Sequence, residues 1–469
     1  MFKFKKVFLK ENNNLESEDK VKHGHFPPAR AIVFGFALLI LLGAILLSLP
    51  FSVRPGQEQI RFIDSLFTAT SAVCVTGLVV VDTNTAWSAF GQVVIILLIQ
   101  IGGLGIMTFA TLFSLFLGRH IGLKERLAIQ ESLNEFSLSG MVRIIKRILI
   151  ATFAIEFIGA AMISTRLIPL YGFGEGIAKS LFHSISSFCN AGFDIFGSAD
   201  NKFISLVSFQ QDPVMLITTT VLIITGGLGF IVWKDIIANK KFSSFILHTK
   251  VVLITTLVLI VSGTLLLYVF ESNNKSTLAN LPTSFKLLNS YFHSVTPRTA
   301  GFNSLSVGEL TEPSKLLTIL LMFIGAAPGS TAGGIKVTTF TLLIWTALSY
   351  IKGDNDVNLL NRRIPNTVII KSFCILMLSL ALIFTTTMVL LINKDGTLMQ
   401  VLFETVSAFG TVGLSTGITP TLCFSSKLMI ILTMFFGRVG PLSAAITIST
   451  AQKHKNQPYR FPEGKIGVG

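Results

Sequence analysis

The chain has 469 residues, of which 51% are hydrophobic and only 13% are charged, and its mean hydropathy is +0.69. This composition is too apolar for a soluble enzyme or binding domain of that length, and it predicts a membrane protein. The net charge of +14 would also suit a nucleic-acid-binding protein, so the positions of the basic residues must decide between the two.

Residues 1–30 form a polar, lysine-rich arm. We expect no cleavable signal there, because the first apolar run is already long enough to span a membrane. Eight runs can cross about 30 Å of hydrocarbon. They lie near residues 31–49, 88–117, 148–165, 214–233, 251–270, 315–350 (interrupted), 367–392 and 428–449. The sequence therefore predicts an all-α polytopic protein with eight transmembrane helices.

Four segments between paired runs end on the same few residues. Their shared glycines are Gly77, Gly192, Gly301 and Gly413, which lie 115, 109 and 112 residues apart. A Leu-Phe or Tyr-Phe pair precedes each glycine, with the Phe ten residues upstream, or nine in the third case. These segments are too short to cross the membrane and too apolar for a solvent loop. Each is predicted to be a re-entrant half-helix followed by a glycine strand.

The basic residues are distributed unevenly along the chain. Of the 38 Lys and Arg, 25 lie in the terminal regions and in the three loops between units, whereas the connections on the other side hold 11. By the positive-inside rule, both termini and those loops are cytoplasmic. The basic excess therefore reflects topology, and we expect no nucleic-acid partner.

The glycine strands carry the residues expected to bind an ion. Non-helical backbone is tolerated at membrane depth where it lines a cavity, and rings of backbone carbonyls can replace the hydration shell of K⁺. Glycine permits the backbone angles that such a strand needs, and the half-helices aim the negative ends of their dipoles at the cavity. The predicted filter, which binds K⁺ through carbonyls only, consists of Val75, Thr76, Gly77, Leu78, Asn190, Ala191, Gly192, Phe193, Thr299, Ala300, Gly301, Phe302, Thr411, Val412, Gly413 and Leu414.

The chain is thus predicted to form four concatenated M1–P–M2 units, each with an outer helix (M1), a pore half-helix with its glycine strand (P) and an inner helix (M2). The four units surround one pseudo-fourfold pore. The predicted parts are a cytoplasmic arm (1–30), pore unit 1 (31–117), a cytoplasmic loop (118–147), pore unit 2 (148–233), a loop (234–250), pore unit 3 (251–350), a loop (351–366), pore unit 4 (367–450) and a cytoplasmic tail (451–469).

The degree of selectivity is left open by the strands themselves. The fourth, from Thr411 to Ser415, differs at two positions from the Thr-Val-Gly-Tyr-Gly filter of potassium channels, and the other three differ more. A less selective channel or transporter for Na⁺ and K⁺ is therefore the alternative function. Asp194, at the outer end of its strand, either concentrates cations at the mouth or is an ordinary solvated acid.

These motifs make the chain similar to the membrane subunit of Ktr-type bacterial potassium uptake systems, in the Trk, Ktr and HKT superfamily. The likeness covers residues 28–469 and includes the motif from Thr296 to Asn303. It implies potassium uptake by a homodimer in the bacterial plasma membrane, which rests on a cytoplasmic nucleotide-binding regulatory ring, with Na⁺ left open as a coupling or activating ion. The tail after Thr450 has no GxGxxG fingerprint, so any nucleotide control would come from that partner.

The third inner helix is interrupted by a glycine- and proline-rich run that cannot continue a helix. In the Ktr-type proteins that the chain resembles, the corresponding stretch is an intramembrane loop beneath the filter. The alternative is a kinked helix packed against its neighbours. Two basic residues lie within spans nearby, and the second occupies the position of a family arginine. The predicted gate is the loop 325–334 (Gly325, Ala326, Ala327, Pro328, Gly329, Ser330, Thr331, Ala332, Gly333 and Gly334) with Lys336 and Arg438.

The remaining polar residues give weaker expectations. Glu156 is a lone carboxylate in an apolar helix, for which a structural hydrogen bond to a neighbouring helix or a protonated acid is expected; a role in transport is the alternative. His183 and His293 lack grouped partners, so a zinc site is not expected, and no nucleophile–base cluster indicates an enzyme. Arg298 would repel an ion if it faced the axis, so we expect it behind the filter. There we hypothesise an ion pair with Glu404, with Asp64 or another acid as the alternative partner.

Overall fold

The computed structural model describes residues 28–105, 141–354 and 356–440. The predicted arm up to residue 27, the loop at 118–140, the tail at 451–469 and the ends of two predicted spans at 106–117 and 441–449 lie outside these residues.

Helices of three kinds recur along the chain in the same order, and we term them outer, short and inner helices. The outer helices are α2 (Pro28–Leu47), α8 (Met141–Tyr171), α12 (Leu247–Glu271) and α16 (Asn366–Ile392). The short helices are α3 (Phe62–Cys74), α9 (Phe173–Phe188), α13 (Thr283–Val295) and α17 (Leu398–Gly410). The inner helices are α5 (Ala89–Leu104), α10 (Pro213–Gly227), α14 (Glu312–Phe323) and α18 (Phe424–Val439).

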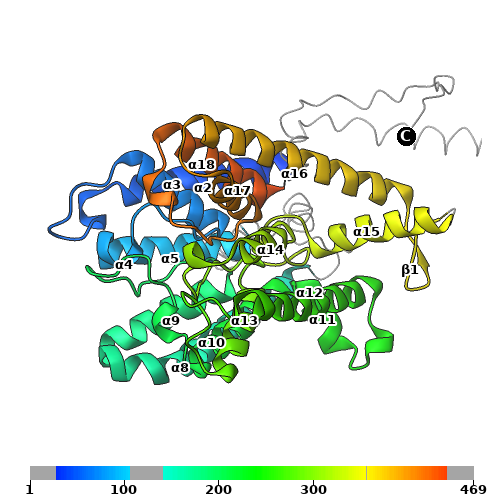
Figure 1. Ribbon diagram of the computed structural model, residues 1–469, viewed down its shortest axis with the longest axis horizontal. Coiled ribbons are helices and arrows are strands. Elements are labelled where there is room, and N and C mark those ends of the chain that lie inside the picture. The colour runs from blue at the N-terminus through cyan, green and yellow to red at the C-terminus, as the bar shows by residue number, and fades with distance from the viewer. Residues whose placement is uncertain (1–27, 106–140, 355, 441–469) are drawn as a thin grey trace, which may run out of the picture.

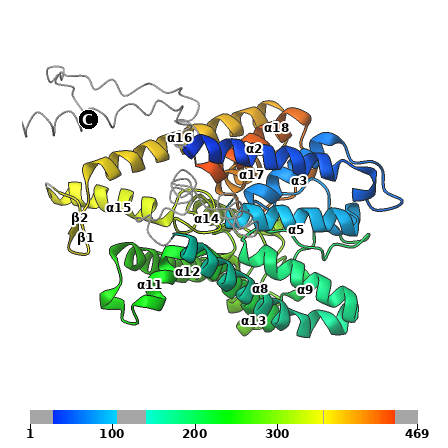
Figure 2. The ribbon, with the colours of Figure 1, turned by 180° about the vertical axis from the view of Figure 1, so that it is seen from behind.

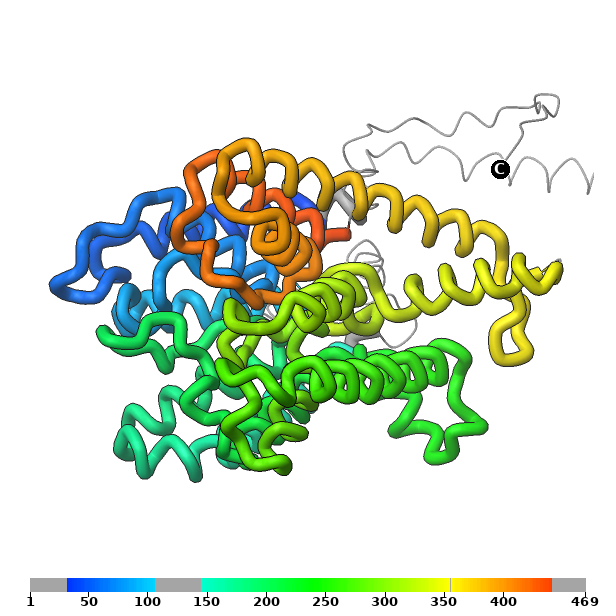
Figure 3. Tube along the Cα trace, viewed as in Figure 1, coloured from blue at the N-terminus to red at the C-terminus, as the bar shows by residue number. Residues whose placement is uncertain are grey.

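The other elements extend or connect these helices. They are α4 (Thr83–Ala86), α11 (Phe230–Ala238), α15 (Val337–Lys352), the strands β1 (Asn358–Leu359) and β2 (Arg362–Arg363), and short 3-10 turns at Pro50–Ser52, Val207–Phe209, Phe242–Ser244, Val307–Glu309 and Thr419–Thr421. β1 and β2 pair as an antiparallel hairpin. This hairpin joins α15 to α16, which project together beyond the rest of the molecule (Figure 3).

The first short helix and the last described inner helix lie side by side. α18 packs against α3, and the blue and orange ribbons are adjacent in both views (Figures 1 and 2). The other inner helices also pack on the short helix that follows them in the chain: α5 on α9, α10 on α13, and α14 on α17. The four groups of helices therefore close into a ring.

The outer helices account for most of the membrane-spanning length. Among the described residues, Ile145–Tyr171, Leu247–Glu271 and Asn366–Ile392 are long and apolar enough to cross a membrane, and α10 with α11 would form a fourth span bent by 93°. These match the predicted spans at 148–165, 251–270, 367–392 and 214–233. Large apolar side chains on the outer helices are exposed, among them Leu257 and Phe384, as expected for surfaces that face lipid.

Glycines with positive φ lie at corresponding positions at or just after the ends of three inner helices. α5 and α18 end at Gly105 and Gly440, and Gly229 separates α10 from α11; all three glycines have φ between 84° and 93°, a conformation that glycine adopts without a steric penalty. The sequence predicted an interruption only in unit 3, so the bend at Gly229 in unit 2 was not anticipated; the remainders of the spans predicted for units 1 and 4 lie outside the described residues. In unit 3, α14 ends at Phe323, as predicted.

Candidate functional site

The short helices end in one repeated backbone geometry. Two residues before each shared glycine, the backbone is left-handed: φ is 58° at Val75, 59° at Asn190, 74° at Thr299 and 51° at Thr411. The glycines themselves have φ of 91°, 70°, 78° and 96° in chain order. Non-glycine residues rarely adopt positive φ. The recurrence of positive φ at four equivalent positions therefore shows that the same turn is used four times.

The four glycines form a closed ring. A Cβ added to Gly77 would lie 2.6 Å from the carbonyl oxygen of Ala191, and one added to Gly192 would lie 2.8 Å from that of Ala300. A Cβ on Gly301 would overlap the carbonyl oxygen of Val412, and one on Gly413 would overlap that of Thr76. Each glycine thus faces the residue before the next glycine, and the order returns to its start.

This ring places the carbonyl oxygens of four residues around one centre: Thr76, Ala191, Ala300 and Val412. The short helices approach it with their carbonyl ends, which carry partial negative charge. Acceptor oxygens in that field suit a cation and disfavour an anion.

Side chains of the short helices hold the glycine segments in place. The amide of Gly77 donates to the hydroxyl of Ser71 (3.0 Å), and that of Gly413 donates to Ser407 (3.1 Å). In the third segment, the hydroxyl of Thr296 donates to the carbonyl of Phe302 (2.6 Å). The backbone angles are therefore maintained from behind the ring.

His183 and His293 serve as further packing links between short and inner helices. Each ring Nε2 is hydrogen-bonded to a threonine of the following inner helix, Thr219 at 3.0 Å and Thr318 at 3.3 Å. Within the described part of the chain, no three His, Cys, Asp or Glu side chains are grouped to hold a metal ion.

A cavity of about 600 Å³ opens outward from the glycine ring. All four shared glycines line it, as do Asp82, Asp194 and Glu309. The pKa of Asp194 is raised to about 6, chiefly because the carboxylate is removed from water, and the negative charge of Asp82 adds to the rise. Asp194 lines the cavity at the end of its strand, and whether it concentrates cations there stays a prediction.

The loop 325–334 lies on the opposite side of the ring. Gly333 packs directly against the side chain of Thr411, at the base of the fourth glycine segment. The loop is closed on itself by Gly325, whose amide donates to Ile335 (2.8 Å), and by Lys336, whose Nζ donates to Ala332 (2.6 Å). Lys336 therefore braces the loop from within.

Thr331 connects this loop to helices of three other groups. Its hydroxyl donates to the carbonyl of Phe188, and its amide donates to that of Gly226, each at 3.4 Å. Its carbonyl accepts a hydrogen bond from the guanidinium of Arg438, which also donates to the carbonyl of Gly102. Arg438 thereby fastens the loop to the ends of the first and fourth inner helices.

Glu156 has a partner that the sequence analysis missed. The side-chain amide of Gln100, on α5, donates to its carboxylate at 3.0 Å, and Cys189 lies 4.0 Å away. Glu156 is only 2% exposed. The expected structural hydrogen bond is confirmed, and a lone glutamine in an apolar inner helix was the signal that could have revealed it.

The hypothesised pair of Arg298 and Glu404 was wrong. Glu404 accepts hydrogen bonds from Ser415, Thr416 and Thr419, all in its own segment. Arg298 donates to Thr256 on α12 instead. The carboxylate satisfies the loop that follows the fourth glycine segment, so it has no acceptor capacity left for a guanidinium. Arg298 does lie behind the glycine segment, as expected.

A different ion pair joins the first and fourth groups of helices. Nζ of Lys427, on α18, lies 2.6 Å from the carboxylate of Asp64, on α3, and both side chains are buried. Arg61 contacts the same carboxylate at 3.0 Å from the surface. The pair joins the last inner helix to the first short helix across 363 residues.

Comparison with known proteins assigns the chain to a family. The chain matches the model of a family described as TrkH, cation transport protein, over residues 40–457. It is 43% identical to the Ktr system potassium uptake protein B of Bacillus subtilis, over 97% of the chain and 100% of the relative. It is 39% identical to the potassium/sodium uptake protein NtpJ of Enterococcus hirae, over 94% and 97%.

The fold also has a solved counterpart. The crystal structure of the potassium transporter TrkH from Vibrio parahaemolyticus superimposes with a TM-score of 0.72, over 92% of this chain and 86% of that one, at 17% identity. At that identity the likeness establishes the shared fold.

Proposed function

The chain belongs to the TrkH family of cation transport proteins, and we propose that it takes up potassium across the bacterial plasma membrane through a filter built by its four glycine segments. The observation that carries this proposal is the closed ring of Gly77, Gly192, Gly301 and Gly413. Because each glycine abuts a carbonyl of its neighbour, the four segments share one axis. The protein is a transporter and not an enzyme.

The ion would be held by backbone oxygens alone. Filter residues 75–78, 190–193, 299–302 and 411–414 would present carbonyls that replace water around K⁺. Support comes from the left-handed residues that precede each glycine and from the hydroxyls of Ser71 and Ser407, which fix the glycine amides.

The four groups of helices would act as four pore units, each with an outer helix, a re-entrant short helix and an inner helix. The ring closure through Lys427 and Asp64 supports this arrangement. Both termini and the basic loops would be cytoplasmic by the positive-inside rule. The chain would work as a homodimer on a separate cytoplasmic nucleotide-binding ring, the partner that the Ktr resemblance implies.

The loop 325–334 would be the gate, with Lys336 and Arg438 as its fastenings. Its position against Thr411, on the side of the ring away from the outer cavity, supports this role. Release of the bond between Arg438 and Thr331 would free one side of the loop from the first and fourth inner helices.

A less selective Na⁺ and K⁺ transporter is the second candidate, favoured by one observation: only the glycine is shared by all four segments. Purified protein in liposomes, with K⁺, Rb⁺ and Na⁺ in competition, separates the two. We expect K⁺ and Rb⁺ to block each other and Na⁺ to compete weakly. Equal competition by Na⁺ supports the second candidate, and saturable uptake of an organic solute with no K⁺ flux contradicts both.

A further inference from the structure

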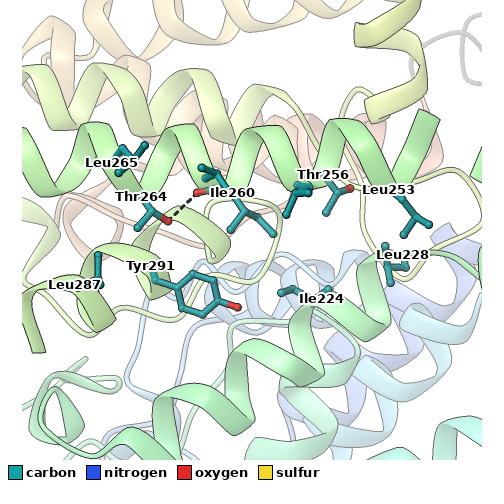
Figure 4. A pocket seen from close by; sticks show the side chains of 11 residues that line it. Ile224, Leu228, Leu253, Thr256, Ile260, Thr264, Leu265, Leu287 and Tyr291 are labelled. Atoms are coloured by element: carbon teal, nitrogen blue, oxygen red, sulfur yellow. Dashed lines mark hydrogen bonds between the residues drawn. The ribbon is translucent and has the colours of Figure 1, made fainter. Parts of the chain in front are cut away.

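A lateral groove of about 570 Å³ lies between α12 on one wall and α10 and α13 on the other. Figure 4 shows Leu253 and Ile260 of α12 on the side of the helix that faces Leu228, Ile224 and Tyr291. The volume falls within the range of about 300–1,000 Å³ that is usual for small-molecule sites.

The lining of this groove is apolar except for the hydroxyl groups of Thr256, Thr264 and Tyr291. The hydroxyl of Thr264 donates to the carbonyl of Ile260 within the same helix (2.7 Å), so it offers no free donor. α12 is one of the described helices that can cross a membrane, which exposes the groove to hydrocarbon. An alkyl chain is therefore the group that suits its walls.

A cation lies behind the Thr256 end of the groove, next to its lining residues but not among them. A smaller void of about 10 Å³ is lined by Arg298 and shares Ile224, Leu228 and Thr256 with the groove. Arg298 is 6% exposed, and its Nε has no hydrogen-bond partner. Among the described residues, no carboxylate forms an ion pair with it. A buried guanidinium without a counter-charge is costly, and the cost falls when a carboxylate pairs with it.

We propose that this groove binds a long-chain fatty acid. Its carboxylate pairs with Arg298 behind the Thr256 end, and its alkyl chain runs along α12 from Thr256 towards Leu265. Arginine binds carboxylates through paired N–H donors, and Nη2 already donates to Thr256, which leaves the remaining donors for the ligand. One ligand thus satisfies both the cation and the apolar walls.

The site lies directly behind the third glycine segment. Arg298 precedes Gly301 by three residues, and Thr296 of the same turn holds the carbonyl of Phe302. An occupant that fixes Arg298 therefore restrains this segment from outside the ring, and the fatty-acid content of the membrane would act on it.

The test is saturation binding of radiolabelled palmitate to the full chain, purified in detergent and stripped of lipid. Leu257→Trp fills the groove from an exposed lining position, and Arg298→Gln removes the charge. We expect each to weaken binding at least about tenfold, as for loss of one charge-assisted contact. Val269→Trp, exposed on the same helix, and Arg54→Gln are the matched controls and should bind as the wild type does.

Several outcomes overturn the proposal. Palmitate that binds the wild type no better than Leu257→Trp removes the site. Hexadecanol that binds as tightly as palmitate, with Arg298→Gln silent, assigns the groove to a lipid tail. A Leu257→Trp chain that binds palmitate normally but changes oligomeric state assigns it to a second copy.

Folding is checked by thermal unfolding of each variant, and Arg298→Lys, which keeps the charge, should retain part of the binding if Arg298→Gln fails to fold. Binding is measured without transport, so its failure is distinct from failure of the proposed function.

Discussion

Arg438 donates a hydrogen bond to the backbone carbonyl of Thr331, a residue 107 positions earlier in the chain. The acceptor belongs to the loop 325–334 and the donor to α18, so the bond ties the proposed gate to a helix of another unit. Side chains at the equivalent positions of the first and second inner helices are absent, because those positions are Gly103 and Gly227.

Arg438→Ala should raise potassium flux. It removes charge-assisted bonds to Thr331 and Gly102, each worth about 1.5–3 kcal/mol. The population of the open loop should therefore rise by a factor of about ten or more. Flux of K⁺ into liposomes measures this, with Lys371→Ala on the exposed face of α16 as control. Unchanged flux in folded Arg438→Ala protein would falsify the fastening role.

Deletion of several residues between Gly325 and Gly334 should likewise raise potassium flux, while ion preference stays near that of the wild type. The reason is that the loop lies beneath the glycine ring and contributes no carbonyl to it. Competition of K⁺ with Na⁺ is measured in the same liposomes. A deletion that inserts and folds but conducts nothing would contradict a gating role.

Gly413→Ala should weaken potassium affinity and increase the share of Na⁺ transported. The added Cβ would overlap the carbonyl oxygen of Thr76, so the ring must distort. Gly417→Ala is a matched control: Gly417 also has positive φ, at 102°, but nothing lies within 4 Å of its Cβ position. If both variants change selectivity alike, backbone strain and not the ring contact is responsible.

External pH should affect uptake through Asp194. Its pKa is raised to about 6, so the carboxylate is charged above that pH and becomes protonated as pH falls through it. Loss of this charge at the mouth should raise the K⁺ concentration for half-maximal uptake by about two- to fivefold.

Asp194→Asn should show the weaker affinity at all pH values and lose the dependence near pH 6, whereas Asp200→Asn, exposed in the same loop, should keep it. A wild-type pH profile that is flat between pH 5 and 8 would rule out this role for Asp194.

Asp64→Asn and Lys427→Met should each destabilise the protein strongly. Removing one member of a buried ion pair leaves the other charge uncompensated, at a cost of about 3–5 kcal/mol. The double variant should lose less than the sum of the two, as read from thermal unfolding in detergent. The exposed pair of Arg363 and Asp356 is the control, for which coupling should be about 1 kcal/mol or less. Strictly additive losses at Asp64 and Lys427 would remove the ring-closing role.

The sequence by itself determined the features that depend on local backbone and composition. Glycines at near-constant spacing predicted the four turns, because glycine adopts positive φ without the steric penalty that other residues meet. The apolar runs predicted the long spans, and the break after Phe323 followed from its glycines and proline.

Only the tertiary structure decided which polar side chains meet. Glu404 binds its own segment and Lys427 binds Asp64, because partner choice depends on how helices hundreds of residues apart are rotated and stacked. The bend at Gly229 and the helix ends at Gly105 and Gly440 were likewise invisible in the apolar runs, since a single glycine continues a helix or ends it according to what packs against it.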